Sequence, residues 1–217
     1  MERYWQLKIS VIILWPMRDF LDLISTPRCG QCGFLGDPVC HRCLAQVQSF
    51  SRHDVLGLGE VRVAAEYQGW VRDTLIAFKS GERTAGFTLA YLLVQILNTN
   101  FTVPLVPIPS TPTKVRQRGF NVTTELCRYL ARQLDRRFLS NECLVVRRNV
   151  LDQVGLSRKQ RQKNLERAFV CTTALRGPVI VLDDVVTTGA TMSEAGRALR
   201  IAGAGPIFGL ALCGTRS

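Results

Sequence analysis

One stretch of the 217-residue sequence decides the fold, and it reads Val179-Ile-Val-Leu-Asp183-Asp184-Val-Val-Thr187-Thr188-Gly189-Ala190-Thr191. The apolar run that opens it is typical of a strand buried on both faces of a sheet. Two carboxylates and a hydroxyl-rich turn follow, and the next residues, Met192 to Ala202, have the spacing of a helix. Ligands of parallel sheets bind beyond the carboxyl ends of the strands, so the sequence predicts a binding site at Asp183 and Asp184.

The turn after the acidic pair has the composition of a phosphate site. A helix N-terminus offers free amides and the positive end of the helix dipole to an anion. Gly189 and Ala190 let the backbone approach a phosphate closely, and Thr187, Thr188 and Thr191 add hydroxyl donors. Two adjacent carboxylates suit the vicinal hydroxyls of a sugar, with Mg²⁺ as a possible bridge.

Three other interpretations of this stretch are weaker. A Walker B strand also ends in acidic residues, but the chain has no GxxxxGK[ST] motif. A response-regulator acid pocket belongs near the start of a domain, whereas only 33 residues (217 − 184) follow Asp184. A helix cap beside two surface acids would not require the whole combination of residues.

Working outward from this stretch, apolar periodicity predicts further strands and helices in alternation. Strands are expected at 61–67, 103–109, 144–146, 178–182 and 206–212, and helices at 70–78, 84–97, 121–134 and 192–202. A basic loop is expected before Asn121, and residues 149–167 have the composition of a long loop or a mobile helix. The alternation predicts an α/β fold with a mostly parallel sheet flanked by helices.

Four cysteines near the N-terminus have the spacing of a zinc site. They form two CxxC knuckles, Cys29-x2-Cys32 and Cys40-x2-Cys43, separated by seven residues. Four thiolates so spaced can surround one tetrahedral ion, and a closed site of four cysteines is structural rather than catalytic. Reduced thiols or a redox pair are the alternatives. The remaining cysteines occupy apolar contexts and are expected in the core, and they are Cys127, Cys143, Cys171 and Cys213.

The lapse of apolar periodicity between Ser49 and Gly59 suggests two units. Residues 1–55 would form an N-terminal helix, expected at 4–23, and a zinc module, and residues 56–217 would form the α/β domain. No apolar run is long enough to cross a bilayer, because the run from Val11 to Trp15 stops at Pro16, and no signal peptide is evident. We therefore expect a cytoplasmic protein.

The formal net charge of +11 predicts an anionic partner. Residues 114–176 contain 15 basic and 5 acidic residues and account for most of the excess. Charge alone leaves three interpretations open, namely a solvated face, phosphate binding and nucleic-acid binding.

The acidic and TTGAT stretch resembles the phosphoribosyl-diphosphate (PRPP) motif of type I phosphoribosyltransferases. The rest of the chain narrows the resemblance to the ComF/GntX family, on the four-Cys knuckle and on the segments Tyr67-x-Gly69, Phe78-Lys79, Val106-Pro-Ile-Pro-Ser110, Arg118-Gly-Phe-Asn121 and Arg161-x-x-Asn164. The match runs from about Cys29 to the C-terminus. It implies a type I phosphoribosyltransferase-like sheet behind a small zinc module.

The resemblance also implies roles for individual residues. Asp183 and Asp184 would contact the ribose hydroxyls, and the turn from Thr187 to Thr191 would hold the 5-phosphate. The segment 107–111, with Pro109 and Ser110, would hold pyrophosphate. A mobile loop at 153–164 would close over the substrate with Arg158, Lys159 and Arg161. Two further basic residues could serve either PRPP or nucleic acid, and they are Arg116 and Arg118.

Two functions fit this resemblance. The first is Mg²⁺-assisted displacement of pyrophosphate from PRPP by an unidentified acceptor, associated with competence and DNA uptake. The second is a non-catalytic PRPP-fold protein that binds single-stranded DNA during natural transformation, alongside helicase-type competence proteins. Candidate aromatic residues for stacking on bases are Trp70, Tyr91 and Phe120.

Overall fold

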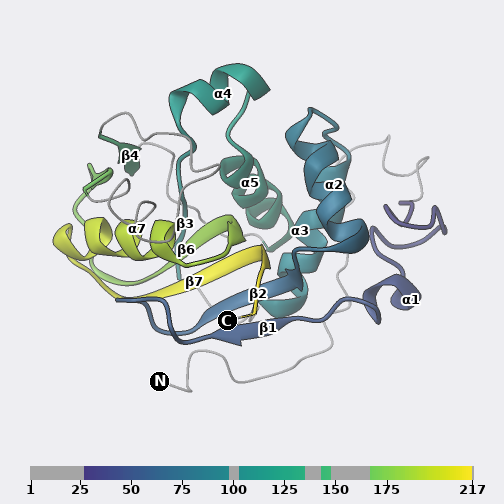
Figure 1. Ribbon diagram of the computed structural model, residues 1–217, viewed down its shortest axis with the longest axis horizontal. Helices are drawn as coiled ribbons and strands as arrows, with labels where there is room; N and C mark the ends of the chain where they lie inside the picture. Colours follow the sequence, from purple (N-terminus) through teal and green to yellow (C-terminus); the bar gives the residue numbers. More distant parts are fainter. Residues whose placement is uncertain (1–26, 98–102, 135–142, 148–166, 217) are drawn as a thin grey trace.

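The computed structural model describes residues 27–97, 103–134, 143–147 and 167–216. Five strands form one sheet in the spatial order β1-β2-β7-β6-β3 (Figure 1). Their bounds are β1 Phe50–Arg52, β2 Val61–Glu66, β3 Leu105–Pro107, β6 Gly177–Val186 and β7 Ala204–Gly214. The edge strand β1 is antiparallel to β2, and all the other neighbours in this sheet are parallel. The predicted α/β class and mostly parallel sheet are therefore confirmed.

Helices cover both faces of the sheet (Figure 1). The helices are α1 His41–Leu44, α2 Gly69–Lys79, α3 Ala85–Ile96, α4 Pro112–Arg118, α5 Val122–Leu134 and α7 Ala190–Ile201. One core cluster joins α2, α3 and α5 to one sheet face, with Leu89, Leu126 and Leu182 fully buried. A second cluster joins α7 to the other face around Met192 and Val181. Burial on both faces explains the continuous apolar run of β6.

The central pair of strands is longer than the sequence predicts. The strand β6 extends to Val186 and therefore includes Asp183 and Asp184, which pair in register with β7. The strand is expected to end at Leu182 because the acidic residues disfavour a strand. The parallel ladder to β7 provides the hydrogen bonds that carry the strand through them.

The segment between β3 and α5 differs from its predicted structure. The sequence predicts a basic loop before Asn121, whereas Pro112–Arg118 forms the helix α4. The Thr111 hydroxyl accepts a hydrogen bond from the Lys114 backbone N–H at 3.4 Å, and Pro112 occupies the first turn. Gly119 ends the helix with a φ of 79°. A cap, a proline and a glycine thus define a helix that has no buried residue and no apolar periodicity.

A small antiparallel sheet stands apart from the main one. Its strands are β4 Leu144–Val146 and β5 Phe169–Cys171, which pair with Leu144 opposite Cys171. The strands pack against α7. The residues that join β4 to β5 include the predicted loop at 153–164, which lies outside the described residues, as does the helix expected at 4–23.

The cysteine-rich segment packs against the helical layer of the main domain. An isolated bridge joins Arg28 to Leu35, and Gly30 lies so close to Thr88 of α3 that a Cβ there would meet its hydroxyl at 2.3 Å. Cys29 and Cys43 belong to the same buried cluster as α2 and α3. Among the described residues, no helix has the length and apolar character that a membrane span needs.

Candidate functional site

The carboxyl ends of the parallel strands meet at one edge of the sheet and surround a cleft of about 200 Å³. Its walls come from the end of α2, the segment after β3, the helix α4, the small sheet, the end of β6 and the start of α7. The lining residues are Lys79, Ile108, Pro109, Ser110, Thr111, Lys114, Arg118, Thr123, Val146, Phe169, Asp183, Asp184, Val185 and Thr191. Segments far apart in the sequence therefore supply one cleft that contains both three cations and an acidic pair.

The acidic pair is asymmetric. Asp183 is 8% exposed, and one of its carboxylate oxygens accepts a hydrogen bond from the Asp184 backbone N–H at 2.8 Å. Burial, and then the charge of Asp184, raises the pKa of Asp183 well above its ordinary value. Two neighbouring carboxylates in one buried place resist ionising together, so the pair tends to hold one proton.

Lys79 favours the ionised form of the second carboxylate, Asp184. Its Nζ lies 2.6 Å from Asp184 Oδ2, and both side chains are about one-fifth exposed. Burial raises the pKa of Asp184, but the charge and hydrogen bond of Lys79 outweigh that effect and bring the pKa below its ordinary value. Asp184 is thus the ionised member of the pair at neutral pH.

The turn Thr187–Thr191 connects β6 to the N-terminus of α7. Gly189 precedes the helix with a φ of 74°, a conformation that favours glycine. The Thr188 hydroxyl accepts a hydrogen bond from the Ala190 backbone N–H at 3.4 Å. Of the five residues predicted to bind the phosphate, Thr191 lines the cleft, whereas Thr187, Thr188, Gly189 and Ala190 are not among its lining residues.

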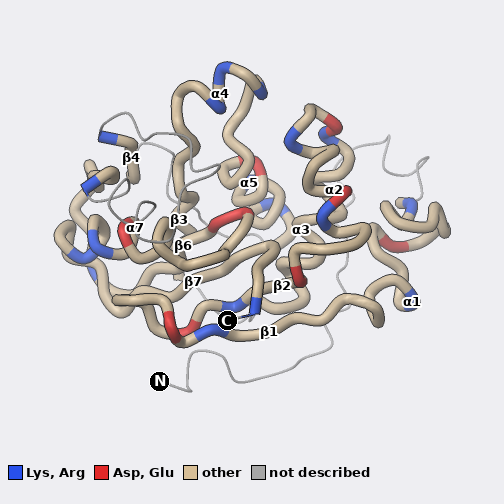
Figure 2. Tube along the Cα trace, viewed as in Figure 1, with Lys and Arg blue, Asp and Glu red and all other residues tan. Residues whose placement is uncertain are grey.

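The segment after β3 forms the opposite wall. Ile108 continues the strand by donating its N–H to the Leu182 carbonyl at 3.0 Å, so Pro109 and Ser110 follow directly above the end of β6. The Thr123 hydroxyl donates to the Ile108 carbonyl at 2.5 Å and ties this segment to α5. Figure 2 shows basic positions on α4 and an acidic stretch on β6.

The structure brings together six of the predicted ligand-site residues in this cleft, namely Asp183, Asp184, Thr191, Pro109, Ser110 and Arg118. Arg116 of α4 does not line it, although Lys114 and Arg118 of the same helix do. Arg158, Lys159 and Arg161 lie outside the described residues.

Sequence reasoning missed two cations of the cleft, Lys79 and Lys114. Lys79 lies in a segment that carries the family resemblance, but its sequence distance from Asp184 hides their ion pair. The signal for Lys114 was the cap at Thr111, because a helix beginning at Pro112 places residue 114 over the segment that follows β3.

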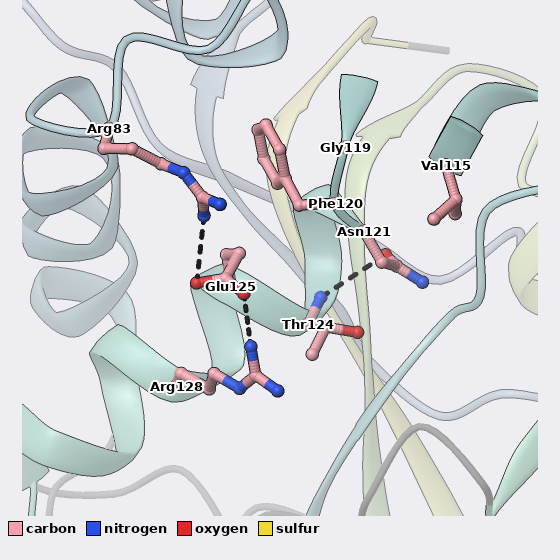
Figure 3. Close-up of a pocket in the computed structure, with 8 residues that line it drawn as sticks. All are labelled: Arg83, Val115, Gly119, Phe120, Asn121, Thr124, Glu125 and Arg128. Atoms are coloured by element: carbon pink, nitrogen blue, oxygen red, sulfur yellow. Dashed lines mark hydrogen bonds and ion pairs between the residues drawn. The ribbon is translucent and has the colours of Figure 1, made fainter. Parts of the chain in front are cut away.

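A second pocket of about 410 Å³ is lined in part by Val115 of α4, the helix whose Lys114 and Arg118 line the cleft. Figure 3 shows Glu125 between two guanidinium groups, with Arg83 at 3.3 Å and Arg128 of the same helix on its other side. The Arg83 guanidinium lies 4.2 Å from the centroid of the Phe120 ring. Phe120 is only 6% exposed, so its predicted role as an exposed stacking platform is wrong; Arg83 already occupies its face.

The four N-terminal cysteines converge as their spacing predicts. The sulfurs of Cys29, Cys32, Cys40 and Cys43 all lie within 4.8 Å of one another. Burial raises the pKa of Cys29, but backbone hydrogen bonds outweigh it and bring the pKa to about 6. Four sulfurs at this spacing fit the tetrahedral donor set that zinc prefers, so the residues present can bind a metal.

The other four cysteines divide into two groups. Cys127, Cys143 and Cys213 are buried, as predicted. Cys171 is only partly buried, and its sulfur lies 3.6 Å from that of Cys143 across the small sheet. Cys171 packs against the second core cluster without being fully buried, so the expectation of a core position holds for it only in part.

Comparison with known proteins identifies relatives along most of the chain. A DNA utilization protein YhgH of Escherichia coli O6:H1 is 28% identical over 203 residues, which cover 89% of this chain and 86% of the relative. Competence protein F of Haemophilus influenzae is 29% identical over 196 residues, covering 81% and 80% of the two chains. The YhgH protein of Salmonella typhi is 33% identical over 135 residues, or 58% of this chain and 59% of the relative.

No family model matches the chain. The relatives from Escherichia coli and Haemophilus influenzae nevertheless match most of its residues, and their names are DNA utilization protein YhgH and competence protein F. The chain is thus a homologue of competence protein F and of the DNA utilization protein YhgH, which confirms its resemblance to the ComF family.

Proposed function

We propose that the cleft at the carboxyl edge of the sheet binds PRPP, and that the α/β domain, residues 56–217, is a phosphoribosyltransferase behind an N-terminal zinc module, residues 1–55. One observation carries this proposal. The acidic pair of β6, Thr191 at the start of α7 and the Pro109-Ser110 segment line a single cleft together with three cations, Lys79, Lys114 and Arg118.

The positions of these residues indicate how PRPP would lie in the cleft. The turn Thr187–Thr191 precedes a helix of 12 residues, whose N-terminus favours the 5-phosphate. The carboxylates of Asp183 and Asp184 accept hydrogen bonds from the two ribose hydroxyls. On the opposite wall, Ser110, Lys114 and Arg118 face the place where a pyrophosphate group at C1 would lie.

The acidic pair also fits a magnesium ion. Carboxylate oxygens are preferred ligands of Mg²⁺, and Asp184 offers a partly exposed, ionised carboxylate to the cleft. Bound with PRPP, Mg²⁺ would neutralise part of the charge of the pyrophosphate.

The chain's own residues supply three effects in the proposed transfer. Asp184 stabilises the positive charge that develops on the ribose ring as the bond to pyrophosphate lengthens. Lys114 and Arg118 stabilise the charge of the departing pyrophosphate. The walls of the cleft fix the C1 atom for attack by the acceptor, which lowers the entropic cost of the reaction. In the same proposal Arg158, Lys159 and Arg161 complete the site when the ligand binds.

Transfer is tested by pyrophosphate release. Wild-type protein is incubated with PRPP, Mg²⁺ and mixtures of nitrogen nucleophiles, and pyrophosphate is measured by a coupled enzymatic assay. We expect release that depends on one acceptor and falls at least 100-fold in Asp184→Asn, about 2.7 kcal/mol of transition-state stabilisation. PRPP binding without release from any acceptor would support a binding protein rather than an enzyme.

A second candidate function is binding of single-stranded DNA, and the names of the relatives favour it. Arg116 is exposed on α4, the helix whose Lys114 and Arg118 line the cleft and whose Val115 lines the pocket that contains Arg83 and Arg128. Several cations on neighbouring elements suit a phosphate backbone, and a helicase-type protein of competence is the partner that this function would require. The test is the anisotropy of a labelled oligonucleotide at several salt concentrations. Arg116→Gln should lower the salt slope by about one unit without changing PRPP binding.

A further inference from the structure

We propose that Arg52 is a positioning residue for the turn Thr187–Thr191, through a strap formed by residues 52–59. The proposal rests on the function proposed above, in which this turn holds the phosphate of PRPP. Arg52 lies at the end of the edge strand β1, 135 residues before Thr187, and does not line the cleft.

The guanidinium of Arg52 is held from two sides. Its Nε and Nη2 donate to the two carboxylate oxygens of Asp54, at 2.9 and 2.6 Å, and Nη1 donates to the Thr187 carbonyl. The side chain is 3% exposed, while that of Asp54 is 42% exposed. Burying an arginine is costly unless its donors are satisfied. The bidentate pair meets this cost and orients the third donor toward the turn.

The hydrogen bond from Arg52 fixes one peptide plane of the turn. In a trans peptide the C=O and the following N–H point in opposite directions. Because the Thr187 carbonyl points to Arg52, the N–H of Thr188 points to the other side of the turn. That side is where the phosphate would bind, so Arg52 prepares an amide donor without touching the ligand.

The rest of the strap fixes the helix that follows the turn. Val55 is buried against Gly189, where a Cβ would meet Val55 Cγ2 at 2.7 Å. Leu58 packs in the same way against Gly196, one to two turns along α7. At the far end, Arg200 donates to the Gly57 carbonyl. The strap thus lies along α7 from its first residue to its last turn.

This arrangement offers a matched pair of variants. Arg52→Met and Arg200→Met each remove an arginine that donates to a backbone carbonyl, one at the turn and one at the far end of the same helix. Arg52→Lys keeps the charge near Asp54 but loses the bidentate geometry. All variants are made in the 217-residue chain. The urea midpoint of each is measured, so that a change in stability is known before the affinities are compared.

The test separates the two halves of the ligand. Ribose 5-phosphate and Mg²⁺-pyrophosphate are titrated separately by calorimetry, since only the first needs the turn. We expect Arg52→Met to weaken ribose 5-phosphate binding about 10-fold or more, Arg52→Lys to fall between it and wild type, and Mg²⁺-pyrophosphate affinity to stay within 2-fold. Arg200→Met should leave both affinities within 2-fold. Equal losses for both ligands in Arg52→Met, or an equal effect of Arg200→Met, would overturn the positioning role.

Failure of the proposed function gives a different result. If wild-type protein binds neither ligand, the phosphate site is wrong, and amide hydrogen exchange then tests the strap alone. Faster exchange at residues 187–191 in Arg52→Met than in Arg200→Met would support Arg52 as the residue that fixes the turn. Equal exchange in the two variants would overturn that role as well.

Discussion

Lys79 and Asp184, 105 residues apart in the sequence, form an ion pair with Nζ 2.6 Å from Oδ2 at the carboxyl edge of the sheet. The pair joins the end of α2 to the end of β6 and leaves one lysine facing a cleft in which a second carboxylate, Asp183, is buried. The charge of Lys79 therefore favours ionisation of Asp184, while the pKa of Asp183 is raised.

The first prediction removes this lysine. In Lys79→Met, the cation that lowers the pKa of Asp184 is lost, and the burial that raises it remains, so the pKa of Asp184 should rise. We also expect PRPP to bind about 10-fold more weakly, because the cleft loses one of its three cations. Carboxyl ¹³C shifts followed against pH measure the first effect. An unchanged pKa of Asp184 in this variant would contradict the ion pair between Lys79 and Asp184.

The second prediction concerns stability and pH. The pKa of Asp183 is higher in the folded than in the unfolded chain, so the folded state binds the proton more tightly. This carboxyl therefore contributes stability at low pH, and the contribution is lost as the pH rises from about 4 through the raised pKa. Asp183→Asn should be more stable than wild type at pH 7, and the difference should shrink toward pH 4.

Urea unfolding at pH 4, 5.5 and 7 measures this difference. The asparagine retains an oxygen that can accept the hydrogen bond from the Asp184 N–H, so loss of that bond does not obscure the result. A variant that is less stable than wild type at pH 7 would mean that Asp183 is ionised and paired in the folded chain.

The third prediction concerns Gly189. A side chain there meets two costs, a φ of 74° and a contact with Val55 at 2.7 Å. Gly119 has a similar φ of 79° and no atom within 4 Å of an added Cβ, so it isolates the first cost. We expect Gly119→Ala to cost about 1 kcal/mol of unfolding free energy and Gly189→Ala about 1–3 kcal/mol more.

A double-mutant cycle checks the cause. Val55→Ala should recover part of the additional cost in the Gly189→Ala background, giving a coupling energy of about 0.5 kcal/mol or more. Equal costs at the two glycines would mean that Val55 does not pack against the turn.

The fourth prediction concerns the metal. The four-cysteine cluster should bind about one zinc ion per chain. Cys43→Ser should lose most of it, and Cys171→Ser, outside the cluster, should retain it. Zinc content is measured by inductively coupled plasma mass spectrometry. Thermal unfolding with and without a chelator then tests whether the metal stabilises the fold. Equal zinc content in the two variants would contradict the assignment.

Much of the core was predictable because its sequence signal is local. The apolar run that begins β6 and the helical spacing from Trp70 to Phe78 each indicate their own element, and the structure confirms both. The same is true of the cysteine cluster, since two CxxC turns separated by seven residues have the local spacing of a four-sulfur site, and the four sulfurs do converge.

Most of the errors come from contacts between distant segments, and the missed helix α4 has a local cause. Strand β1 has three residues and exists by pairing with β2, so no periodicity indicates it. Helix α4 has no fully buried residue and is defined by its cap rather than by an apolar face. The partners Lys79 and Arg52 of the site depend on the order of strands in the sheet, which a single sequence does not fix.

The measurement that tests the central claim most directly is calorimetric titration of PRPP with Mg²⁺ into three full-length proteins. Wild type should bind with micromolar affinity, and Asp184→Asn at least 10-fold more weakly, a loss of about 1.4 kcal/mol. The control Asp73→Asn, at a carboxylate that is 69% exposed on α2, should bind as wild type does. No binding to folded, zinc-loaded wild type, or equal binding to all three proteins, would contradict the proposal that this cleft is a PRPP site.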